Sequence, residues 1–187
     1  MADTVESHLP EPSVAHRRLD VFVGTWHAEG ESYAEDQRAD EPRASAVPWT
    51  SEESYEWLPG RFFLLHRWDA MAGQRPFKGT EIIGYDEAQG GYFTRFFDNA
   101  GNHPEYRASV DKNVWTFTEP ATRATVTISD NRDSMRSTGN GGSAEATGFR
   151  FATASRVASD SDITFAAIRR DEERKRHDAR MVSDSAT

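Results

Sequence analysis

The sequence predicts an all-β protein: a single antiparallel up-and-down β-barrel of about ten strands, with a short N-terminal helix closing one end. Two observations carry this prediction. From about residue 21 to residue 170, apolar and polar residues alternate with the period of two that strands require. Short aromatic and β-branched segments also recur at close spacing, with turn residues between them. Because an open sheet of ten strands would leave unpaired edges, we expect the sheet to close on itself.

The expected elements begin with a short helix over residues 14–22, in which Val14, Leu19 and Phe22 share one face. Hairpin-length loops that carry Gly, Asn, Asp or Pro separate the strands that follow. Two longer stretches are expected to be loops, an acidic one over residues 34–48 and a mobile, Gly/Ser-rich one over residues 136–146. The expected strands cover residues 21–33, 51–57, 61–69, 79–85, 91–98, 105–110, 114–119, 123–129, 147–157 and 162–170.

A chain of 187 residues suits one domain with a sizeable core. We expect a flexible lead-in over residues 1–14, the barrel over residues 15–170 and a charged tail over residues 171–187.

The composition excludes several classes of function. The net charge of −9 argues against binding to nucleic acid or to an anionic membrane. Because the chain has no cysteine, it has neither a disulfide nor a Cys-ligated metal. The six histidines never form a close pair, so no metal site is predicted. The polar N-terminus lacks the apolar stretch of a secretory signal, which predicts a cytoplasmic protein.

Strand parity separates the side chains that enter a barrel from those that face solvent. On the first strand, Trp26 shares a face with Gly24 and Gly30. This arrangement of small residues around one indole predicts a structural closure of the barrel rather than a ligand contact.

The next two strands supply the first candidates for a ligand site. Parity turns Tyr55 and Trp57 inward on the second strand, and Leu64, His66 and Trp68 inward on the third.

On the fourth and fifth strands both faces carry apolar groups, so the alternation does not decide which side chains point into the barrel. Arg95 is a surface charge if it faces outward, which we favour, and needs a partner such as Glu81 if it faces inward. The full set of candidate ligand-binding residues is Tyr55, Trp57, Leu64, His66, Trp68, Glu81, Tyr85, Arg95 and Phe97.

Four separated pieces of sequence resemble the DUF1579 family, which groups lipocalin-like (calycin) barrels of unknown function. They are FVGTW at residues 22–26 with Gly30, EWLPGRF at residues 56–62, IGYD at residues 83–86 after Gly79, and FD at residues 97–98 before Gly101. The resemblance to calycin barrels implies that Trp26 packs across the closed end. It also implies that an arginine of the final strand, Arg169 or Arg170, lies over this indole, where cation–π attraction would stabilise it.

The chain also resembles the nitrobindin-like haem barrels, at Gly24-Thr25-Trp26 and Gly30 and loosely over residues 62–68. That resemblance implies a haem held by a histidine near the C-terminus. The late histidine here is His177, whose charged neighbours suit an apolar haem pocket poorly. We therefore expect no cofactor and keep haem as an alternative.

These observations predict a protein that binds a small hydrophobic molecule in a barrel cavity. An enzyme that uses the same cavity for cyclisation or isomerisation stays an alternative, although no Gly-x-Ser-x-Gly, P-loop or Rossmann motif is present and no catalytic residue is predicted. A third alternative is an interaction protein whose barrel is filled by its own side chains and which acts through its surface. Apolar residues on both faces of residues 61–69 and 91–98 leave a homodimer open.

Overall fold

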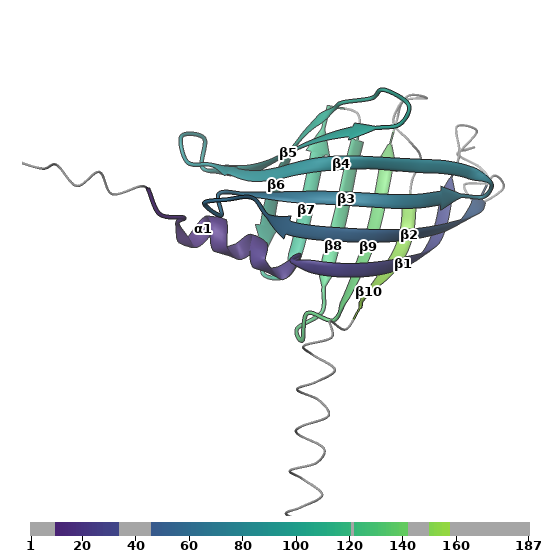
Figure 1. The fold of residues 1–187 in the computed structure, drawn as a ribbon, viewed down its shortest axis with the longest axis horizontal. Coiled ribbons are helices and arrows are strands. Elements are labelled where there is room, and N and C mark those ends of the chain that lie inside the picture. Colours follow the sequence, from purple (N-terminus) through teal and green to yellow (C-terminus); the bar gives the residue numbers. More distant parts are fainter. Residues whose placement is uncertain (1–9, 34–45, 121, 142–149, 158–187) are drawn as a thin grey trace, which may run out of the picture. The chain divides into compact units, whose positions relative to one another are not determined.

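The computed structural model describes residues 10–33, 46–120, 122–141 and 150–157. These residues form a closed antiparallel barrel in which each strand pairs with its neighbours in the chain and β1 pairs with β10 (Figure 1). The predicted all-β barrel is therefore confirmed. The elements are α1 (Val14–Arg17), the 3-10 helix η1 (Arg18–Val21), β1 (Gly24–Tyr33), β2 (Ala46–Trp57), β3 (Phe63–Ala72), β4 (Arg75–Asp86), β5 (Gly91–Asp98), β6 (Glu105–Asp111), β7 (Val114–Glu119), β8 (Thr122–Ile128), β9 (Ser134–Gly141) and β10 (Arg150–Arg156).

Strand β9 corrects the expectation of a mobile loop over residues 136–146, because residues up to Gly141 belong to the sheet. Its Gly and Asn residues have little strand preference of their own. Ladders to β8 and β10 on both sides hold them in place, and the hydroxyls of Thr125 and Thr138 lie 2.7 Å apart across one ladder.

One further expectation differs from the structure at a strand position. Strand β2 begins at Ala46, so the end of the expected loop over residues 34–48 is part of the sheet. The strand expected over residues 162–170 lies outside the described residues. The chain divides into one unit over Met1–Arg156 and a second over Val157–Thr187.

The N-terminal helical segment packs at one end of the barrel (Figure 1). Leu19 and Phe22 are buried as expected, but Val14 is 69% exposed and His16 is buried in its place. Phe62 and Tyr85 meet the His16 ring edge to face, which explains this preference. The hydroxyl of Tyr92 donates a 2.9 Å hydrogen bond to the Ala15 carbonyl and ties the helix to β5.

Trp26 is fully buried at this closed end, and its Nε1 donates a 2.7 Å hydrogen bond to the Phe22 carbonyl. Gly24, with φ of 133°, makes the turn from the helix into β1. The arginine over the indole is Arg156, 4.8 Å from the ring centroid, because β10 places it opposite Trp26. The implied Arg169 or Arg170 is thus corrected to Arg156; residues 169 and 170 lie outside the described part of the chain.

The side chains that line the inside of the barrel differ in size from one side of the barrel to the other. Strands β2, β3 and β4 turn bulky side chains inward, among them Trp49, Trp68 and Phe77. Strands β9 and β10 turn small ones inward, including Ser137, Ala152 and Ala154. Within the described residues, no helix is long and apolar enough to cross a membrane.

Candidate functional site

Three neighbouring strands bring an acid–base cluster onto the bulky side of the inner wall. The strand register places Tyr55 of β2 opposite His66 of β3, and His66 opposite Glu81 of β4. Glu53 precedes Tyr55 by two residues on the same face of β2. Directly paired and diagonal side chains on one face of a sheet lie within reach of each other. We name Glu53, Tyr55, His66 and Glu81 the His66 cluster.

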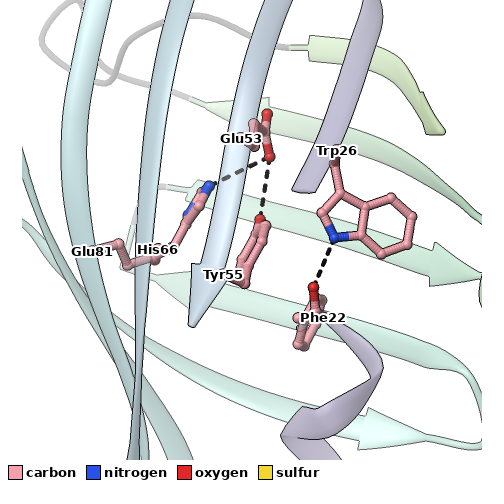
Figure 2. A network of polar contacts seen from close by, with 6 residues as sticks. All are labelled: Phe22, Trp26, Glu53, Tyr55, His66 and Glu81. Carbon is pink, nitrogen blue, oxygen red and sulfur yellow. Dashed lines mark hydrogen bonds and ion pairs between the residues drawn. The ribbon is translucent and has the colours of Figure 1, made fainter. Parts of the chain in front are cut away.

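The imidazole of His66 lies between the two carboxylates (Figure 2). Its Nδ1 forms a 2.9 Å hydrogen bond with Oε2 of Glu81. Its Nε2 lies 3.4 Å from Oε2 of Glu53, which is an ion-pair distance but does not meet hydrogen-bond geometry. The Tyr55 hydroxyl donates to that same oxygen of Glu53 at 3.2 Å. The ring of His66 therefore has charged neighbours on both nitrogens.

Burial and charge act on His66 in opposite directions. The side chains of His66, Glu53 and Glu81 are 10%, 12% and 16% exposed. Burial alone would lower the pKa of His66, but the interactions with Glu53 and Glu81 outweigh it and raise the pKa above 6.5. The two carboxylates thus favour the protonated form of His66 more than burial disfavours it.

Several buried polar atoms around the cluster lack hydrogen-bond partners among the described residues. They are the hydroxyls of Ser51 and Thr94, Nε1 of Trp68 and Nε2 of His66. Ser51 precedes Glu53 by two residues on the inner face of β2, and Trp68 follows His66 by two on β3. Buried polar groups in folded proteins are nearly always satisfied, so these atoms call for a partner such as water or another molecule.

Aromatic side chains surround this polar centre. The ring of Trp68 lies 5.2 Å from that of His66, and the rings of Phe77 and Phe96 lie 5.6 and 5.9 Å from Trp68. Within the described ranges, no group of three or more His, Asp or Glu side chains has an arrangement that would hold a metal ion.

The family model of DUF1579, described as a protein of unknown function, matches residues 11–137. The chain belongs to the DUF1579 family. The match includes every member of the His66 cluster. Comparison with curated proteins gives no match.

The structure of this DUF1579 protein brings four of the sequence-predicted residues together. Tyr55, His66 and Glu81 belong to the His66 cluster, and Trp68 adjoins it. The sequence left open whether Glu81 points inward or outward. In the structure it points inward, and its partner is His66 rather than Arg95.

Three other predicted residues face the helical end of the barrel. Leu64 is fully buried in the core there. Trp57 donates from Nε1 to the carboxylate of Asp20 at 2.8 Å, and the ring of Tyr85 packs against Tyr92.

Arg95 and Phe97 are on the outer face, so their inclusion among the ligand-binding candidates is corrected. Strand β5 turns Tyr92 and Thr94 inward, where both are buried, so its alternation turns Arg95 and Phe97 outward. Arg95 is exposed and Phe97 is 50% exposed.

Among the residues assigned to barrel closure, Gly24 and Trp26 are at the closed end. Gly30 lies farther along β1, opposite Trp49 of β2 and Ala152 of β10. His177, on which the haem alternative depends, lies outside the described residues.

Glu53 is the cluster residue that sequence reasoning missed. The alternation of the strand could have found it, since Glu53 shares a face with Tyr55 and Trp57, which were expected to point inward. Its companion Glu52, on the opposite face of β2, does face solvent and pairs with His27 at 2.6 Å.

Proposed function

We propose that this protein binds a small, largely apolar molecule inside the barrel, with a neutral polar group of that molecule at the His66 cluster. The observation that carries the proposal is the pair of buried, unsatisfied polar atoms beside the cluster, the hydroxyl of Ser51 and Nε1 of Trp68. A ligand that offers hydrogen-bond acceptors to this hydroxyl and this N–H group would satisfy both. The two carboxylates of the cluster disfavour an anionic group there.

The surrounding wall supports the same ligand class. Aromatic rings on β3, β4 and β5 offer apolar contact, and the small inner side chains of β9 and β10 oppose them. Small-molecule sites typically combine a mainly apolar lining with a few placed polar groups.

The neutral probe N-phenyl-1-naphthylamine tests this proposal. We expect saturable binding of one probe per chain, with quenching of tryptophan fluorescence. The variant Ser51→Phe adds bulk to the inner face and should weaken binding at least about tenfold, a change of about 1.4 kcal/mol. Its control is Thr50→Phe on the exposed face of the same strand, which should leave binding unchanged. Absence of saturable binding, or equal effects of the two variants, would contradict the proposal.

The geometry of His66 supports a second candidate, an enzyme that isomerises an apolar substrate by proton transfer. Glu81 orients the imidazole through Nδ1, and Glu53 lies 3.4 Å from Nε2, so an acid and a base are side by side. The probe 5-nitrobenzisoxazole loses a carbon-bound proton to a base and opens to a coloured phenolate through cleavage of its N–O bond. If the cluster acts as a base, Glu53→Gln should slow this reaction at least about tenfold and Glu52→Gln should not. A rate equal to that of free acetate would contradict the enzyme candidate.

A further inference from the structure

A cavity lies between the N-terminal helical segment and the turns that join β6 to β7 and β8 to β9. It is a groove of about 500 Å³. That volume falls in the range of small-molecule sites. We propose that this groove binds a small organic anion with an apolar body.

The charges around the groove carry the proposal. Four cationic side chains line it: Arg17, Arg18, Lys112 and Arg132. All four are exposed, and none forms an ion pair within the described part of the chain. This gathering of cations is unexpected in a chain of net charge −9. A locally positive groove on an acidic protein attracts anions and repels cations.

Two acids also line the groove, and one of them is already paired. Asp20 accepts hydrogen bonds from Arg61 at 2.9 Å and from Nε1 of Trp57 at 2.8 Å. Asp130 is the other. The four cations therefore exceed the acids that could balance them.

The floor of the groove is apolar and held in place. Trp115 and Ile128 are buried in the barrel core and contribute to the lining. Asn113 donates from its amide to the Ile128 carbonyl at 2.7 Å, which fixes one turn against the other. Lys112 and Arg132 have φ of 54° and 59°, so each cation lies at a tight turn beside this floor. Cations around an apolar floor suit an amphiphilic anion better than inorganic phosphate.

The fluorescent anion 8-anilino-1-naphthalenesulfonate tests the groove directly on the full chain. We expect binding that weakens at least about tenfold in the double variant Arg18→Gln/Arg132→Gln and that falls at about 1 M salt, where the screening length is about 3 Å. Lys112→Gln, on a different turn, should weaken binding as well. Matched controls are Arg95→Gln and Arg123→Gln, exposed cations elsewhere on the barrel. Thermal unfolding of each variant checks that it is folded.

A competition experiment separates this groove from the barrel interior. Saturating N-phenyl-1-naphthylamine should leave the sulfonate bound, because the two probes occupy different sites. Displacement of the sulfonate by the neutral probe, equal affinity in the double variant, or no sulfonate binding would each overturn the proposal. Failure of the neutral probe alone would count against the interior site and leave the groove in place.

Discussion

The phenol ring of Tyr55 lies flat against the imidazole of His66, with centroids 3.9 Å apart and planes at 5° to each other. The two residues are direct cross-strand partners between β2 and β3. The Tyr55 hydroxyl also donates to Glu53, so one side chain supports both the imidazole and a carboxylate next to it. Tyr55 is therefore a positioning residue for His66.

Two substitutions at Tyr55 separate its ring from its hydroxyl. Tyr55→Phe keeps the stacking and should lower the free energy of unfolding by about 1 kcal/mol, the usual contribution of one hydrogen bond. Tyr55→Leu removes the stacking too and should cost about 2 kcal/mol, measured by urea unfolding. Equal losses in the two variants would mean that the stacking contributes nothing.

The pH dependence of stability should report His66. Because its pKa in the folded protein is raised above 6.5, protonated His66 stabilises the fold fully below that value, and this stabilisation is lost as pH rises through the folded pKa. We expect the free energy of unfolding of the wild-type protein to fall as the pH rises from 6.5 through the folded pKa of His66. In His66→Gln the same free energy should depend less on pH.

The exposed His27 provides the control for this experiment. Hydrogen bonds to Glu52 and Glu29 raise its pKa above 6.5 as well, so its contribution has the same sign. Because His27 is 43% exposed, salt should screen its effect, whereas that of His66 should persist. An NMR titration that places the pKa of His66 below 6.5 would show that burial outweighs the two carboxylates.

Gly79 allows the indole of Trp68 to lie close against β4. A Cβ at Gly79 would overlap the Trp68 ring and lie 2.5 Å from the carbonyl oxygen of Phe97. Gly79→Ala should therefore destabilise the protein by about 2 kcal/mol and change the emission of Trp68, as expected for an overpacked site. At Gly91 a Cβ would meet nothing within 4 Å, so Gly91→Ala should leave stability almost unchanged. Thermal unfolding of the two variants measures the difference. Equal stability of the two variants would show that β4 shifts freely.

Arg156 should stabilise the closed end of the barrel and should not affect ligand affinity. It lies over the Trp26 ring and donates to the Val21 carbonyl at 3.3 Å. Arg156→Ala should lower the free energy of unfolding by about 1–2 kcal/mol, through the lost cation–π contact and hydrogen bond. The affinity for N-phenyl-1-naphthylamine should not change, and Arg95→Ala on the outer face should leave both quantities unchanged. A loss of probe affinity in Arg156→Ala would place the closed end within the binding site.

Strand parity predicted the side-chain directions well where one face of a strand is clearly polar. It placed Tyr55, His66 and Trp68 inside correctly, since β3 alternates cleanly and the aromatic residues of β2 lie on one face. It left Glu81 and Arg95 open because β4 and β5 carry apolar groups on both faces, and only neighbouring strands decide which face is covered. Strand β9 escaped prediction because its ladders to β8 and β10, rather than its composition, hold it extended.

The sequence by itself determined the all-β class, the closure of the sheet and the family, because these depend on local alternation, turn residues and separated motifs along the chain. The tertiary structure alone decided that Glu53, His66 and Glu81 meet, since their contact depends on the register of three strands. The same holds for Arg156 over Trp26 and for the cationic groove. A one-residue change of register would turn the strand residues among them to the other face of the sheet, whereas the groove depends on where the helical segment packs against the turns.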